Sequence, residues 1–301
     1  MPDEKDALQR PGRSTGAVGQ AVRWVGLQVD LHAPHTWFGP SWALLAGILS
    51  SGGLGFDLRS VLFAAVAWLV SDPLLGSLLA VSLDAAKARH SCTRPPLPPA
   101  RWSLPYVQAG SPGQRLLDAL AARAARLKWH WEATEGGALR WLLLAFMGLV
   151  MGAVAGPGPF IVLTLAVLGL LGIAAGRPLH SEERDSLAAA HLLTAWLVGH
   201  STFGPLDPGT VLVGLGFATI WYAWTRQPPL LRLLAVAHVL VAGLLAALRA
   251  PLAAGGVLLL AVPLVVLVPE NGGRRRSYLQ HTQAFLMASM LLAACGLVWP
   301  L

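Results

Sequence analysis

The chain has 301 residues, of which 55% are apolar and only 12% are Asp, Glu, Lys or Arg. Soluble globular chains carry about 25% charged residues, so this chain has too few polar residues to cover a water-facing surface of its size. The composition excludes a soluble enzyme and indicates a multi-pass membrane protein. Two cysteines, Cys92 and Cys295, exclude a disulfide framework and a four-cysteine metal site.

Apolar runs of the length of a spanning helix begin after a charged segment, 1–35, which is expected to be cytoplasmic. Such a helix needs about 20 residues, and the period of two that strands would show is absent. Glycine and proline clusters separate the runs. The predicted fold class is all-α, a membrane domain over 36–301 with nine transmembrane helices. These cover 36–54, 60–82, 138–155, 159–176, 186–203, 209–225, 230–248, 251–269 and 280–299.

The basic residues give the expected orientation, because loops on the cytoplasmic side of a membrane are enriched in Lys and Arg. With the N-terminus in the cytoplasm, only Arg59 and Arg249 of the 22 Lys and Arg residues fall outside. This bias predicts nine spans with a cytoplasmic N-terminus. It also explains the net charge of +7 by topology and lipid attraction, so we expect no nucleic-acid partner.

One sizeable polar segment, 83–137, is expected to be a cytoplasmic loop. Its first part contains four prolines within 95–99, which exclude a helix. Its second part, Pro112 to Trp131, has leucines on one side and predicts a helix lying in the membrane interface. Contact with a partner protein is the alternative, and the candidate residues for it are Arg115, Arg123, Arg126, Trp129 and Trp131.

A short pattern at the first span resembles a known family. The chain reads Pro34-His35-Thr36-Trp37-Phe38-Gly39-Pro40-Ser41-Trp42-Ala43 and continues to Ser50-Ser51-Gly52. This pattern is similar to the start of the UbiA superfamily of intramembrane prenyltransferases, above all its chlorophyll and bacteriochlorophyll synthase branch. The resemblance implies a bundle of nine helices with a cytoplasmic N-terminus.

The resemblance also implies two aspartate-rich cytoplasmic motifs that bind Mg²⁺ and the diphosphate of an isoprenoid donor. In the first region, 82–90, the acidic residue is Asp84, and Arg94 matches the arginine that follows the family motif. In the second region, 221–229, there is no carboxylate. A hard cation needs carboxylate oxygens, so we expect no Mg²⁺ site. The acidic run 182–185 reads instead as the first turn of the fifth helix.

Polar and aromatic residues within the predicted spans are the remaining candidates for binding. A neutral imidazole facing a pocket could ligate the metal of a tetrapyrrole, although an interhelical hydrogen bond is the simpler interpretation for each histidine. Deep tryptophans could line a cavity for a pigment or isoprenoid tail, or simply pack in the core. The candidates are His191, His200, His238, His281, Trp42 and Trp221.

The sequence therefore predicts a catalytically degenerate UbiA-like protein that serves as a structural or pigment- or lipid-binding subunit of a larger, photosynthetic membrane complex. Its expected ligands are (bacterio)chlorophyll, carotenoid or quinone, and its expected partners are reaction-centre or light-harvesting proteins. The alternative is an active prenyltransferase with an atypical metal site that combines Asp84 with Glu182, Glu183 or Asp185. A solute transporter would require an inverted repeat, which the sequence does not show.

Overall fold

The computed structural model describes residues 34–53, 55, 57–91, 110–133, 137–175, 181–226, 229–267 and 275–299. Every regular element within these ranges is helical, which confirms the all-α prediction. The elements are α2 (Pro34–Ser50), α3 (Leu58–Leu69), the π-helical turn η2 (Val70–Leu74), α4 (Leu75–Ser91), α5 (Pro112–Ala133), α6 (Gly137–Ala155), α7 (Pro157–Ala175), α8 (Ser181–Phe203), α9 (Pro208–Thr225), α10 (Leu231–Ala247), α11 (Pro251–Val266) and α12 (Arg275–Val298).

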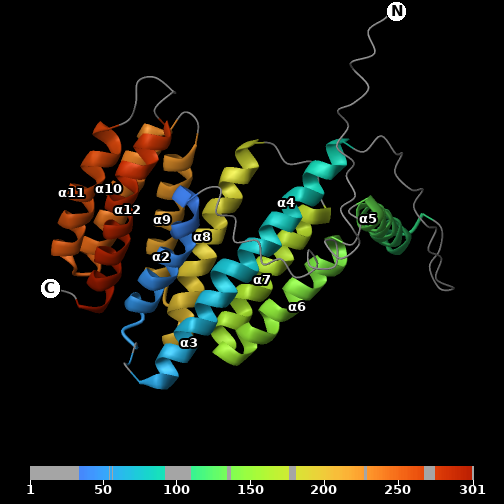
Figure 1. The fold of residues 1–301 in the computed structure, drawn as a ribbon, viewed down its shortest axis with the longest axis horizontal. Coiled ribbons are helices and arrows are strands. Elements are labelled where there is room, and N and C mark those ends of the chain that lie inside the picture. Colours follow the sequence, from blue (N-terminus) through green and yellow to red (C-terminus); the bar gives the residue numbers. More distant parts are fainter. Residues whose placement is uncertain are drawn as a thin grey trace, which may run out of the picture.

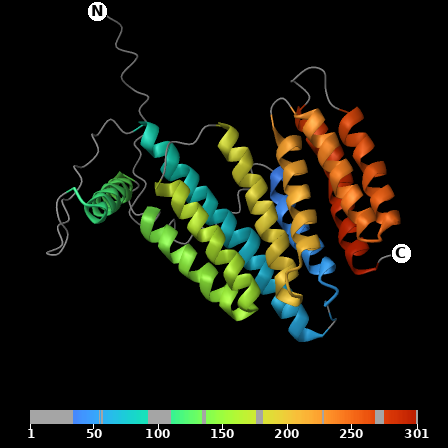
Figure 2. The ribbon, with the colours of Figure 1, turned by 180° about the vertical axis from the view of Figure 1, so that it is seen from behind.

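The helices form a bundle in which successive long helices run in opposite directions (Figures 1 and 2). On one side, α2 packs against α8 and α12, and the row continues through α9, α10 and α11. On the other side, α4, α6 and α7 pack together. The turn η2 contacts both α2 and α8, so it lies where the two sides meet.

Apolar side chains line the outside of the bundle as well as its core. The core includes Trp196, Phe217, Trp224 and Met290. Large apolar residues are also exposed along whole helices, such as Phe146 and Val154 on α6, Leu165 on α7 and Leu259 on α11. In the described ranges, Leu58–Leu83 and Tyr278–Val298 are long and apolar enough to cross a membrane. The predicted count of nine spans and the orientation remain predictions.

The predicted end of the first span was wrong. The first span was expected to run to residue 54, but α2 ends at Ser50, and Gly52 follows with a positive φ of 65°. The hydroxyls of Ser50 and Ser51 donate to the carbonyls of Gly47 and Ile48, which satisfies two carbonyls of the last turn. The second predicted span, 60–82, agrees with the apolar stretch Leu58–Leu83, and the helix itself continues beyond that stretch to Ser91.

Two glycines allow α2 and α8 to approach closely. A Cβ on Gly47 would collide with the carbonyl oxygen of Trp196, and a Cβ on Gly199 would collide with that of Leu44. Any larger residue at either position would therefore force the two helix backbones apart.

The predicted helix of the polar segment is present as α5, which is seen nearly end-on at the edge of the bundle in Figure 1. It contacts α4, α6 and α7. Ala121 is buried, whereas Leu116 and Leu120 are exposed. The helix is therefore in place, and its position in a membrane interface remains a prediction.

Candidate functional site

A carboxylate, Asp72, interrupts the apolar helix that runs from Leu58 to Leu83. It lies in the π-helical turn η2, directly before Pro73. Proline has no N–H to donate to the preceding turn, and π-helical turns within α-helices occur frequently at functional sites. The interruption places the Asp72 side chain between α2 and α8, because η2 contacts both helices.

A directed chain of hydrogen bonds ends on Asp72. The indole Nε1 of Trp68 donates to the hydroxyl of Ser41 over 3.0 Å. The Ser41 hydroxyl donates in turn to Oδ2 of Asp72. An indole N–H can only donate, so Ser41 accepts from Trp68 and directs its own proton to the carboxylate.

The imidazole of His191, on α8, reaches the same turn. Its Nε2 lies 2.6 Å from the backbone carbonyl oxygen of Ser71. A carbonyl only accepts, so Nε2 carries the proton. The carboxylate of Asp72 is close enough to interact electrostatically with the ring. We call Ser41, Trp68, Ser71, Asp72 and His191 the Asp72–His191 cluster.

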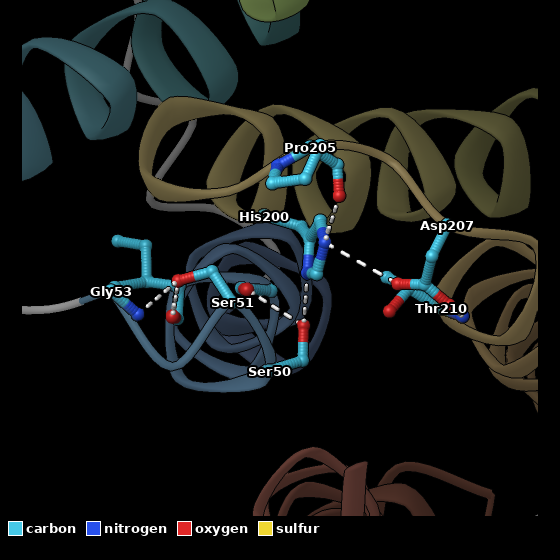
Figure 3. Close-up of polar contacts among 9 residues, drawn as sticks. Ser50, Ser51, Gly53, His200, Pro205, Asp207 and Thr210 are labelled. Atoms are coloured by element: carbon cyan, nitrogen blue, oxygen red, sulfur yellow. Dashed lines mark hydrogen bonds and ion pairs between the residues drawn. The ribbon is translucent and has the colours of Figure 1, made fainter. Parts of the chain in front are cut away.

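A second polar group lies at the C-terminal ends of α2 and α8, where His200 stands between Ser50 and Asp207 (Figure 3). Nδ1 of His200 lies 2.9 Å from the Ser50 hydroxyl. Nε2 lies 2.9 Å from the carbonyl oxygen of Pro205 and 3.6 Å from Oδ2 of Asp207. The imidazole therefore joins the end of α2 to the connection between α8 and α9.

Asp207 also caps α9, since its Oδ1 accepts from the backbone N–H of Thr210 over 2.9 Å. Burial alone would raise the pKa of this carboxyl. The hydrogen bonds from Thr210 and the nearby His200 outweigh that effect and lower the pKa of Asp207 below its ordinary value of 3.8. Asp207 is therefore ionised at neutral pH.

Serine, histidine and aspartate together are the residue types of a hydrolytic triad, but their arrangement here is structural. In such a triad the histidine presents one nitrogen to an accessible serine and the other to a buried carboxylate. Here Ser50 is 6% exposed, and its hydroxyl also donates to Gly47. The carboxylate of Asp207 is the exposed partner, with a side chain 53% exposed. The group holds two helix ends together.

The four predicted histidines lie at separate places. His191 belongs to the Asp72–His191 cluster, and His200 lies at the end of α8. His238, on α10, is 1% exposed; its Nδ1 lies 2.8 Å from the carbonyl oxygen of Leu234. Within the described ranges, its Nε2 is buried without a hydrogen-bond partner. His281 is exposed on α12.

The predicted tryptophans also lie in different environments. Trp42 is half-buried on α2. Trp221 is 2% exposed, and its ring occupies the space that the missing side chain of Gly39 leaves. It lies 5.1 Å from the ring of Trp224, whose Nε1 donates to the hydroxyl of Thr282. Trp221 and Trp224 thus pack in the core where α9 meets α2 and α12.

The residues implied for Mg²⁺ lie largely outside the described set, so the expected absence of a Mg²⁺ site remains a prediction. Asp84 lies on α4 with its side chain outside the described set, and Arg94 lies outside the described residues altogether. The last turn of α9, where the second motif would begin, consists of Tyr222, Ala223, Trp224 and Thr225 and holds no carboxylate. Among the described side chains, no three His, Cys, Asp or Glu residues gather as a metal site would need.

The predicted partner-contact residues lie on or beside α5. Arg115 is exposed on its first turns. The side chains of Arg123, Arg126, Trp129 and Trp131 fall outside the described set. Their role as a contact surface remains a prediction.

Comparison with known proteins gives one distant similarity. The chain is 23% identical over 200 residues to the bacteriochlorophyll synthase 34 kDa chain of Chloroflexus aurantiacus. The match covers 64% of this chain and 54% of the relative, so it spans about half of that protein's length. No family model and no solved structure matches the chain. The similarity supports a distant relationship to the UbiA-like prenyltransferases.

Asp72 is the site residue that the sequence analysis missed. A signal for it was present, because ionisable residues inside apolar spans are rare and mark functional sites. The family motifs lie in loops, whereas Asp72 lies twelve positions before Asp84, inside a predicted span. Its partners Ser41 and His191 are 31 and 119 residues away in sequence, so only the fold brings them together.

Proposed function

We propose that the chain is a multi-pass protein of a bacterial inner membrane. The apolar outer faces of α6, α7, α10 and α11 support this, because a water-soluble protein rarely exposes contiguous apolar patches of such size. The similarity to bacteriochlorophyll synthase and the one-sided distribution of Lys and Arg agree with it. In this arrangement the bundle crosses the bilayer nine times with a cytoplasmic N-terminus.

Within that membrane, the proposed role is to bind a pigment or prenyl lipid without transferring it. The observation that carries this proposal is the small number of carboxylates in the two regions where the resemblance implies metal-binding motifs. Residues 82–90 hold Asp84 as their single acidic residue, and residues 221–229 hold none. A leaving diphosphate needs its charge neutralised, and a single carboxylate is a poor ligand set for the ions that would do so.

The proposed ligands are (bacterio)chlorophyll, carotenoid or quinone, bound in a complex with reaction-centre or light-harvesting proteins. Among the candidate histidines, His238 has the orientation of a metal-ligating imidazole. Its Nδ1 is held by a backbone carbonyl, as second-shell partners hold metal-bound histidines, and its Nε2 is buried without a partner among the described residues. We therefore place His238 first for a test of tetrapyrrole binding.

The experiment is purification of the tagged full chain from its native membrane in mild detergent, followed by solvent extraction and mass spectrometry. We expect pigment or prenyl lipid and other membrane subunits to co-purify. Substituting His238→Leu should reduce a bound tetrapyrrole, while the exposed His281→Leu should not. A protein that purifies alone and without such molecules would contradict the proposal.

The alternative is an active prenyltransferase that uses Asp84 with residues of the acidic run 182–185. A transfer assay with geranylgeranyl diphosphate and Mg²⁺ separates the two. Turnover that depends on Mg²⁺ and disappears in Asp84→Ala would replace the binding role by an enzymatic one.

A further inference from the structure

The Asp72–His191 cluster contains polar atoms that have no hydrogen-bond partner among the described residues. It gathers polar groups from α2, η2 and α8 at a depth where the neighbouring residues are apolar, such as Val70 and Leu74. Ionisable residues at such depth are costly and mark binding or transport sites. The atoms of the cluster that have no partner indicate which kind of ligand it would bind.

The carboxylate of Asp72 offers one unused acceptor. Its Oδ2 receives the Ser41 hydroxyl, which Trp68 orients. Among the described residues, no hydrogen bond reaches Oδ1 of Asp72, and the side chain is only half-buried. This oxygen therefore remains available to a donor.

The imidazole of His191 offers a second acceptor. Its Nε2 donates to the Ser71 carbonyl, so a neutral ring presents the lone pair of Nδ1. Within the described part of the chain no partner reaches Nδ1. Gly76 places no side chain beside this ring; a Cβ there would lie 3.5 Å from Cε1 of His191.

A buried hydroxyl in the same turn as Asp72 also lacks a hydrogen-bond partner among the described residues. Ser71 is 0% exposed, and its Oγ has no hydrogen-bond partner among the described residues. Leaving a buried polar group unpaired destabilises the fold. Such groups are uncommon in native proteins and call for an explanation, such as a bound molecule that completes the network.

We propose that the Asp72–His191 cluster binds the hydroxyl head of an isoprenoid alcohol or quinol, whose proton is accepted by Oδ1 of Asp72, with Nδ1 of His191 as the alternative acceptor. This inference rests on the proposed lipid-binding role and names the head group that the site selects, which for a quinone ligand is the reduced form, the quinol. Both unused atoms accept, so the ligand must donate, and the surrounding apolar residues suit a hydrocarbon chain.

The same chemistry rejects related lipids. A diphosphate is an anion without donors, and the carboxylate of Asp72 repels it. A quinone or a methyl ether offers only acceptors, so its binding would leave Asp72 and His191 unpaired in an apolar layer. Sites built to hydrogen-bond a hydroxyl discriminate strongly against analogues that lack it, because buried polar groups then stay unpaired.

The test measures binding to the full chain in lipid nanodiscs by titration calorimetry, with empty nanodiscs as the blank. The probes are geranylgeraniol, its methyl ether, geranylgeranyl diphosphate and the quinol decylubiquinol. We expect the alcohol or the quinol to bind at least about tenfold more tightly than the ether, as one lost hydrogen bond to a charged group implies. The alcohol and quinol arms identify the source of the hydroxyl.

The variant Asp72→Asn should abolish most of this preference, since its amide can donate to the ether oxygen. The matched control is Asp118→Asn, which makes the same change at an exposed position on α5 and should keep the wild-type ratio. Equal binding of alcohol and ether by the wild-type protein overturns the inference alone, even if Asp72→Asn does not fold. A failure of every probe to bind counts against the lipid-binding role as well.

Discussion

Nδ1 of His200 lies 2.9 Å from the hydroxyl of Ser50, and this contact joins two helices whose residues are 150 positions apart in the chain. Ser50 ends α2, and His200 lies in the last turn of α8. Both helices continue into connections at the same end of the bundle. The contact therefore fixes the point at which α2, α8 and the start of α9 meet.

Replacing His200 by Ala should lower the stability of the fold. The substitution removes the partner of the buried Ser50 hydroxyl and of the Pro205 carbonyl, and we expect a loss of about 1–3 kcal/mol. The measurement is the thermal unfolding midpoint in detergent, followed by tryptophan fluorescence. His281→Ala, at an exposed position, is the control. An unfolding midpoint in His200→Ala equal to that of the control would show that the group does not hold the helices.

The cap of α9 should make stability depend on acid pH. The folded-state pKa of Asp207 is lowered from 3.8, chiefly through its hydrogen bonds with Thr210 against the opposing effect of burial. A lowered folded-state pKa means that the carboxylate contributes stability above about pH 4, and that this contribution is lost as the pH falls through the folded-state value. The contribution is small because the side chain is half exposed to water.

The variant Asp207→Asn isolates this charge, since asparagine also caps helices. The difference in unfolding midpoint between wild type and variant should be positive at neutral pH, should begin to decrease near pH 3.8 and should vanish only below the lowered folded-state pKa of Asp207. A difference that stays constant across this range would show that the carboxylate charge is not involved.

Most helices could be predicted from the sequence because the length of each apolar run can be read directly from it. The helix ends were less predictable. Residues 84–91 continue α4 beyond the apolar run, since alanine, lysine and arginine are good helix formers whether or not they are apolar. The end of α2 depends instead on local hydroxyl contacts of Ser50 and Ser51, which a hydropathy profile does not contain.

The candidate site was less predictable than the fold. Histidines inside spans could be named from the sequence, but their tautomers and partners depend on which helix faces which. His191 meets the carbonyl of Ser71 only because η2 packs on α8. The same contact brings Asp72 close to His191. The cluster therefore follows from tertiary packing rather than from any local motif.

Close packing of α2 on α8 should be sensitive to a single methyl group. In Gly47→Ala the new Cβ would collide with the backbone of Trp196, which has no flexible end to move away. We expect a loss of about 2 kcal/mol or more in the free energy of unfolding, as overpacked interiors show.

In contrast, a Cβ on Gly169 of α7 would meet no atom within 4 Å. Gly169→Ala should therefore be neutral or slightly stabilising, because alanine favours helix. Equal unfolding midpoints for the two variants would contradict the close approach of α2 and α8.

The proposed orientation can be tested by labelling single cysteines from either side of the membrane. The background is a chain in which Cys92 and Cys295 are replaced by serine. We expect Ser111→Cys, at the start of α5, to react with a membrane-impermeant maleimide only when the cytoplasmic face is accessible, as in inverted vesicles. Asp57→Cys, before α3, should react in intact cells, because the short connection from α2 to α3 lies at the other end of the bundle (Figure 1). Asp57 is exposed and Ser111 is half-exposed, so burial does not prevent the labelling of either position. Reaction of both cysteines from the same side would contradict the nine-span arrangement, and reaction of each from the opposite side would reverse its orientation.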